Sequence, residues 1–173
     1  MGDMNLKRII ASLAMLTVLA IALPSATSAD PKVIEDTVDP GITDGTAARE
    51  LSDARTLWKS TGIRRYRFSI QASCFCPYRD PVKVTVRGKK VKLSDPDWFG
   101  PKTVPALFKF IREAIDGQSA MLTVKYNRSK GFPRLISVDR DRMVVDEEIS
   151  YRVTKFSRIH TKPVPVSPAP EEN

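Results

Sequence analysis

The hydrophobic pattern of the chain switches between two periods, and each period predicts a different kind of element. Apolar side chains recur at three- and four-residue spacing over residues 46–60, which predicts a helix that ends before Gly62. A second stripe of this kind over residues 103–116 predicts another helix, with Thr103 as its N-terminal cap and Gly117 at its end.

Elsewhere the apolar positions alternate with polar ones, which is typical of strands that have one face in water. The longest alternation directs six side chains to one side, namely Tyr66, Phe68, Ile70, Ala72, Cys74 and Cys76. Shorter alternations lie at residues 82–87, 91–93, 122–126, 136–138 and 149–153. Phe156 is out of phase with the last of these, which indicates a bulge or a bend. We therefore predict an α+β fold, an antiparallel sheet of about six strands with two helices packed on one face, in the order αβββαβββ.

Residues 1–29 have the pattern of an export signal. Lys7 and Arg8 precede an uncharged apolar run over residues 9–23, and small side chains follow as far as Ala29. The run is shorter than the roughly 20 apolar residues that a membrane span needs. We expect cleavage of this signal peptide near Ala29 and export to the periplasm or the extracellular space, with no transmembrane span left after cleavage.

The net charge of +8 is unevenly distributed along the chain. Residues 46–160 hold 24 basic and 12 acidic side chains, which gives +12. Residues 30–45 hold one Lys and five acids, and their lack of apolar periodicity predicts a disordered acidic linker. Residues 161–173 are rich in Pro, which predicts a disordered, extended tail. The predicted organisation is thus a single α+β domain over residues 46–160 between two flexible flanks.

The composition excludes several classes of site. One His and two Cys are too few for a zinc finger, a multi-disulfide scaffold, or a metal site or triad that needs two histidines. The chain also lacks a Gly-rich phosphate loop and a nucleophile elbow. We therefore expect no cofactor and no metal, and the sequence argues against an enzyme.

Several short motifs carry a resemblance to a known family. In the first half they are Tyr66-Arg67-Phe68, Cys74-Phe75-Cys76-Pro77 and Val84-Thr85-Val86. In the second half they are Val124-Lys125-Tyr126-Asn127, Gly131-Phe132-Pro133 and Asp146-Glu147-Glu148. Over about residues 50–156 the chain resembles the family DUF6174. The resemblance implies an exported or envelope-attached bacterial protein and no particular activity. Asn127 stands where an Asp is usual in that family, which argues against a cation site.

Cys74 and Cys76 are the sharpest chemical feature. In an oxidising compartment they can form an internal disulfide only with each other. Positions i and i+2 of a flat strand lie about 6.5–7 Å apart, the upper limit for a disulfide, although Pro77 permits distortion at a strand end. Three interpretations stay open: a structural disulfide, two buried thiols on the apolar face, or a redox site.

A basic sheet face is the second candidate. Its members alternate with apolar residues or lie at the following turn, and they are Arg65, Arg67, Lys83, Arg87 and Lys89. Such a face attracts anions, and export makes an envelope polymer or a lipid headgroup a more natural partner than nucleic acid. The alternative is a solvated face that only keeps the protein soluble.

An acidic loop is a weaker candidate, for a cation. Its carboxylates include Asp139, Asp141, Asp146 and Glu147. Clustered carboxylates can hold Ca²⁺, but the spacing of a known calcium loop is absent. The alternative is neutralisation by the interleaved Arg140 and Arg142.

These features together predict an exported, non-catalytic domain that binds an anionic envelope component or a protein partner. The first alternative is a periplasmic protein with thiol–disulfide activity at Cys74 and Cys76. The second is a purely structural envelope protein. The three hypotheses differ in whether the basic face or the cysteines carry a function.

Overall fold

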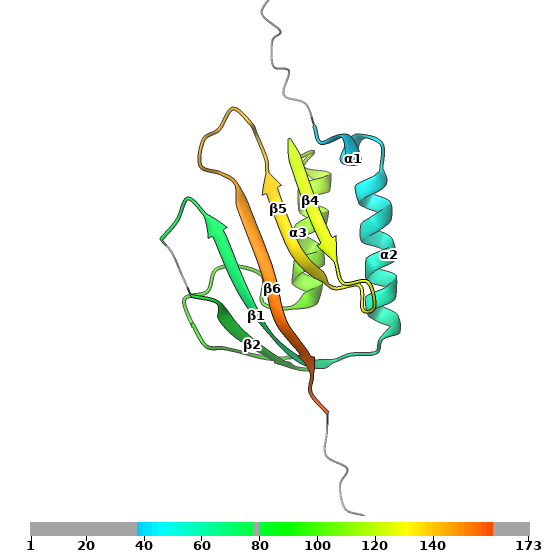
Figure 1. Cartoon of the computed structure of the whole chain (residues 1–173), viewed down its shortest axis with the longest axis vertical. Coiled ribbons are helices and arrows are strands. Elements are labelled where there is room, and N and C mark those ends of the chain that lie inside the picture. The colour runs from blue at the N-terminus through cyan, green and yellow to red at the C-terminus, as the bar shows by residue number, and fades with distance from the viewer. Residues whose placement is uncertain (1–37, 78–79, 161–173) are drawn as a thin grey trace, which may run out of the picture. The chain divides into compact units, whose positions relative to one another are not determined.

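Six antiparallel strands form one sheet, and two long helices cover one of its faces (Figure 1). The structure is a computed structural model that describes residues 38–77 and 80–160, all within the compact unit Ile34–Asn173. The helices are α1 (Pro40–Thr43), α2 (Thr46–Ser60) and α3 (Val104–Asp116). The strands are β1 (Arg65–Cys74), β2 (Val82–Arg87), β3 (Lys90–Leu93), β4 (Met121–Tyr126), β5 (Pro133–Asp139) and β6 (Ile149–Arg158).

The strand order is β3-β2-β1-β6-β5-β4, so the first and last strands of the domain pair at the centre of the sheet. This arrangement confirms the predicted α+β class and the αβββαβββ order of its main elements. Figure 1 shows α3 behind β4 and β5, and no described element in front of the opposite face. We call that opposite face the open face.

Both long helices have the predicted extents. The helix α2 covers residues 46–60, and the left-handed Gly62 follows its end with φ of 61°. The helix α3 begins after Thr103, whose hydroxyl accepts a hydrogen bond from the Ala106 amide at 3.1 Å. The Val104 amide donates to the Tyr66 hydroxyl at 3.0 Å, which ties the first turn of α3 to β1.

The short helix α1 corrects the prediction of disorder over residues 30–45, as far as residues 38–45 are concerned. Asp39 caps α1 by accepting from the Gly41 amide at 2.8 Å. Its second carboxylate oxygen accepts from the Leu122 amide at 3.0 Å, on the edge strand β4. The Asp39 carboxylate thus accepts hydrogen bonds from an unpaired amide of a helix and from an unpaired amide of a sheet edge. The second contact joins residues far apart in the chain, so the acidic composition of this segment does not predict it.

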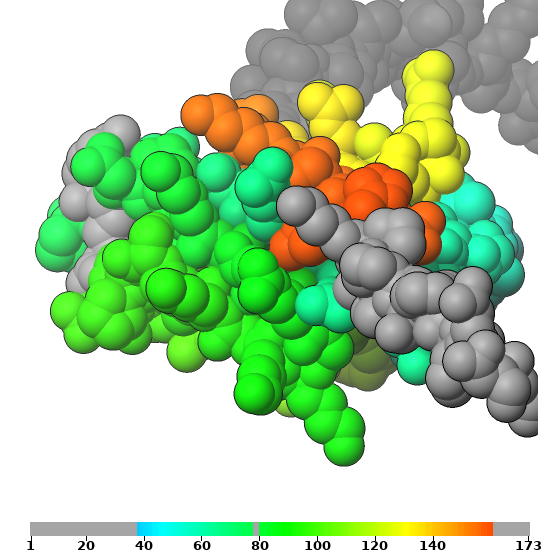
Figure 2. All heavy atoms as spheres, turned by 90° about the horizontal axis from the view of Figure 1, so that it is seen from below, coloured from blue at the N-terminus to red at the C-terminus, as the bar shows by residue number. Residues whose placement is uncertain are grey.

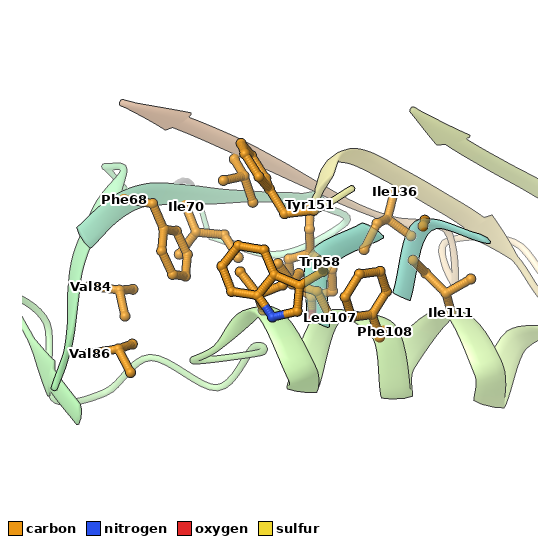
Figure 3. Close-up of a cluster of buried hydrophobic side chains, with 14 of the residues drawn as sticks. Trp58, Phe68, Ile70, Val84, Val86, Leu107, Phe108, Ile111, Ile136 and Tyr151 are labelled. Carbon is orange, nitrogen blue, oxygen red and sulfur yellow. The ribbon is translucent and has the colours of Figure 1, made fainter. Parts of the chain in front are cut away.

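The core lies between the sheet and the two long helices. Tyr66, Phe68 and Ile70 of β1 face this core, and each pairs across the sheet with a buried valine of β2. Figure 3 shows Trp58 of α2 between the side chains of the sheet and Leu107 of α3. The alternation in the sequence therefore gives the inward face of these two strands correctly.

The predicted irregularity near Phe156 is confirmed as a bulge. The pairing of β1 with β6 shifts register between Arg67 and Ser69, and Lys155 has a φ of 51°. The shift turns Phe156 towards the helices, where it stacks on Phe132 with ring centroids 4.3 Å apart. Without this extra residue the aromatic ring would point to water.

The predicted signal peptide over residues 1–29 and the predicted tail over residues 161–173 lie outside the described residues. None of the helices in the described part of the chain is both long and apolar enough to span a membrane.

Candidate functional site

The open face of the sheet carries many cations. Its eight exposed basic side chains come from five strands and are Arg65, Arg67, Lys83, Arg87, Lys90, Lys92, Lys125 and Arg152. Of the residues of the six strands that point this way, the one acid is Asp139, which is 9% exposed and ends β5. The surface of the open face is therefore strongly electropositive.

The cations are densest on β1, β2 and β3. We call these six side chains the cationic patch: Arg65, Arg67, Lys83, Arg87, Lys90 and Lys92. Arg65, Arg87 and Lys90 are direct neighbours across the three strands. Arg67 and Lys92 lie in the next row, on either side of one β2 residue. With strands about 4.8 Å apart and same-face residues about 7 Å apart, the six fit in roughly 10 by 14 Å.

Carboxylates do not neutralise the cationic patch. Within the described part of the chain, none of its six members forms an ion pair, and the two ion pairs seen are both on α3. Arg67 is held by a hydrogen bond from its Nε to the Ser157 hydroxyl at 2.9 Å. Like charges directly opposite each other in a sheet destabilise it by about 0.2–1 kcal/mol per pair. Arg65, Arg87 and Lys90 therefore repel one another, and a bound anion would reduce this repulsion.

The structure brings together four of the five predicted anion-site residues and separates the fifth. Arg65, Arg67, Lys83 and Arg87 share the open face, whereas Lys89 lies in the β2–β3 turn and lines a hollow near α3. Figure 2 views the end of the molecule at which β1 begins, where green side chains of the β2–β3 hairpin project.

The open face has further cations beyond those predicted from the sequence. Lys92 is one of them: it points outward beside Thr85, and the alternation of Val91 and Leu93 already indicates this phase of β3. Arg152 and Lys125 belong to the open face because they flank Leu135 across β4, β5 and β6. Only the long-range pairing of β1 with β6 shows that they extend the same surface.

The two cysteines form a disulfide at the end of β1. The strand ends at Cys74, the chain turns, and the Cys76 amide donates to the Cys74 carbonyl at 2.7 Å. This turn brings the two Cα atoms to 5.2 Å, well within disulfide range. The hypothesis of two buried thiols is therefore wrong: Cys76 is exposed, and Phe75 between the cysteines is 80% exposed. The predicted inward phase of Cys76 fails because the strand has already ended.

The acidic loop between β5 and β6 does not gather its carboxylates. Asp141 accepts from the Met143 amide at 2.8 Å, which makes it a turn residue. Its neighbouring arginines have other partners: Arg140 lies 5.9 Å from the centre of the Phe110 ring, and Arg142 donates to the Ala120 carbonyl. Across residues 38–77 and 80–160, no three His, Cys, Asp or Glu side chains come close enough to hold a metal ion.

Asn127 has a local structural role. Its side-chain oxygen accepts from the Lys130 amide at 2.9 Å and from the Ser129 amide at 3.2 Å. An Asp carboxylate at this position could accept the same hydrogen bonds without a bound cation.

A family model described as a family of unknown function (DUF6174) matches residues 50–158. No curated protein and no solved structure matches the chain significantly.

Proposed function

The chain belongs to the DUF6174 family, and we propose that its domain is an exported, non-catalytic module that binds an anionic envelope polymer. The open face is the binding surface, and the cationic patch covers the side of it that β1, β2 and β3 form. The observation that carries this proposal is the row of Arg65, Arg87 and Lys90, three cations side by side without a carboxylate partner in the described residues.

The form of the surface favours an extended polyanion over a small one. The cationic patch lies on a sheet face rather than in a pocket, and its charges repeat at strand and residue spacing. A flexible chain of phosphate or carboxylate groups can meet several of these charges at once, and each contact releases counterions. Arg side chains add planar, paired donors that match such groups.

Export is part of the proposal and rests on the apolar run after Lys7 and Arg8. In the envelope the available polyanions carry phosphate or carboxylate groups. A bilayer with anionic headgroups presents the same charged groups, and binding to vesicles distinguishes it from a soluble polyanion.

The test compares two double variants with the same change in charge. Arg65→Glu/Arg87→Glu reverses two cations in the densest row of the cationic patch, whereas Arg55→Glu/Lys59→Glu reverses two cations on α2, away from the open face. The probe is fluorescently labelled polyphosphate, titrated by anisotropy at several salt concentrations. Vesicles containing phosphatidylglycerol form the second arm.

We expect the patch variant to lose about 100-fold in affinity at about 0.1 M salt, because about two phosphate contacts are lost and two like charges are added. The α2 variant should stay within about threefold, since long-range charge effects are screened beyond about 10 Å. If both variants lose the same affinity, binding depends on net charge alone and the open face is not a specific site. Binding to vesicles but not to polyphosphate would assign the patch to lipid headgroups instead.

One observation favours the thiol–disulfide alternative, namely the exposure of Cys76 at the end of β1. A redox site needs a thiol of low pKa once the disulfide is reduced. That alternative predicts that the reduced protein alkylates rapidly near neutral pH. It also predicts that Cys74→Ser abolishes disulfide exchange with glutathione.

A further inference from the structure

Two hollows on the helix side of the domain join into one groove. The first lies between α2 and α3 with a volume of about 350 Å³, and the second lies where α3 begins, with a volume of about 340 Å³. They share Trp58 and Pro105. We call the two together the helix groove. Each is within the range of about 300–1,000 Å³ typical of small-molecule sites.

The floor of the helix groove is apolar. Trp58 and Phe108 form it in the first hollow, and Tyr66 and Val86 continue it in the second. These four side chains are 3–7% exposed, so they are packed against the core and present a fixed surface. Figure 3 shows Trp58 and Phe108 near each other, on α2 and α3 respectively. The floor therefore offers a narrow apolar strip that a hydrocarbon chain can contact without rearrangement of the fold.

The rim of the helix groove is cationic. Among the residues that the structure describes, six basic side chains line it and no carboxylate does: Arg55, Lys59, Arg64, Lys89, Lys109 and Arg112. Two of them form ion pairs along the exposed flank of α3, Lys109 with Glu113 at 3.2 Å and Arg112 with Asp116 at 3.6 Å. Exposed pairs of this kind contribute only about 0.3–0.5 kcal/mol, so they yield easily to a ligand.

The helix dipole explains the position of only one of the six rim cations. Lys59 lies in the last turn of α2, where a cation is favourable beside the helix dipole. The other five come from α2 itself, the segment before β1, the β2–β3 turn and α3, and the helix dipole of α2 does not explain why they lie together.

We propose that the helix groove binds an amphiphilic anion, with its hydrocarbon chain on the Trp58–Phe108 floor and its carboxylate or phosphate head among the rim cations. The charge complementarity selects an anion, and the apolar floor selects a ligand that carries a hydrocarbon chain. This site is separate from the cationic patch, which lies on the open face, and it goes beyond the function proposed above. The two proposals therefore stand or fall independently.

The test uses the fluorescence of Trp58. Bromine quenches tryptophan on contact, so 11-bromoundecanoate below its micelle concentration is the probe, and 11-bromoundecanol is the uncharged control. Trp98, the second tryptophan, lies elsewhere in the core with its N–H bonded to the Pro101 carbonyl at 3.1 Å. Binding in the helix groove should therefore quench only part of the total signal, and quenching should saturate. Isothermal titration of the unmodified protein with undecanoate checks the affinity without fluorescence.

Two double variants locate the site. Arg55→Glu/Lys59→Glu should weaken binding of the bromo acid about tenfold or more, which corresponds to about 1.4 kcal/mol. Arg65→Glu/Arg87→Glu, with the same change in charge on the open face, should leave it within about twofold. Displacement by dodecyl phosphate or by laurate then ranks the two headgroups, and either order supports the proposal.

Three results would overturn it. Quenching that never saturates would mean that no site exists. Equal affinity for the bromo acid and the bromo alcohol would show an apolar surface that does not recognise the charged head. Equal losses in the two double variants would show attraction by net charge alone.

Discussion

Gly131 is the position where the fold should tolerate a methyl group least. It lies in the turn between β4 and β5 with a φ of 76°, and its amide donates to the Asn127 carbonyl at 2.8 Å. A Cβ atom built there would lie 2.2 Å from the Ala54 carbonyl oxygen and 2.9 Å from the Trp58 nitrogen, both in the backbone of α2. Neither partner is a flexible side chain that can move aside.

The Gly131→Ala substitution should therefore destabilise the domain in two ways. A left-handed backbone costs a non-glycine residue about 1–2 kcal/mol. Forcing the turn and α2 apart adds about 1–3 kcal/mol, as overpacking does in cores. We expect the free energy of unfolding to fall by about 2–5 kcal/mol. With a urea m-value of about 1.5 kcal/mol/M, the midpoint should move down by about 1–3 M.

Gly88→Ala is the matched control. Gly88 has a φ of 63°, but no atom lies within 4 Å of its would-be Cβ. It should lose only the backbone contribution of about 1–2 kcal/mol. Urea unfolding followed by circular dichroism measures both variants. If Gly131→Ala loses no more stability than Gly88→Ala, the close approach of the turn to α2 is not part of the native structure.

Three further measurements test the packing and the disulfide. Tyr66→Phe should lower the free energy of unfolding by about 1–3 kcal/mol, because the buried Val104 amide loses its acceptor. The control Tyr151→Phe should lower it by under about 0.5 kcal/mol. Equal losses in the two variants would contradict the role of the Val104–Tyr66 hydrogen bond. Burial raises the pKa of Tyr66, Tyr126 and Tyr151 above the ordinary value near 10. The native state therefore holds these protons more tightly, so the free energy of unfolding in urea should be level in this respect below about pH 10 and should fall as the pH rises above it. Early ionisation of all tyrosines, seen as absorbance at 295 nm without unfolding, would contradict their burial. Cys74→Ser/Cys76→Ser should lower the free energy of unfolding by only about 1–2 kcal/mol, because the loop that the disulfide closes is very short. The variant should bind polyphosphate as tightly as the unmodified protein. A loss of that affinity would show that the cysteines take part in binding.

The local pattern of the sequence predicts the elements well, because each one obeys a short-range rule. The three- and four-residue spacing defines α2, and the alternation from Tyr66 to Ile70 gives the inward face of β1. Even the bulge is visible in the sequence, since Phe156 is too large and apolar to be left in water. These signals need no knowledge of which strands pair.

The rest depends on contacts between residues far apart in the chain. Asp39 looks like part of an acidic linker until Leu122 of β4 is placed beside it. The helix groove needs the ends of α2 and α3 to meet, which no periodicity encodes. Cys76 was assigned to a strand because alternation alone cannot show where β1 stops. The full extent of the open face required the pairing of β1 with β6.

The proposed function requires that the open face, and not the helix side of the domain, binds the polyanion. Backbone amide chemical shifts of the labelled protein, recorded during titration with short-chain polyphosphate, test it most directly. We expect the shift changes to concentrate on β1, β2 and β3 around Arg65, Arg87 and Lys90, and the amides of α2 and α3 to stay unchanged. Shifts spread evenly over all exposed basic residues, or centred on α2 and α3, would contradict it.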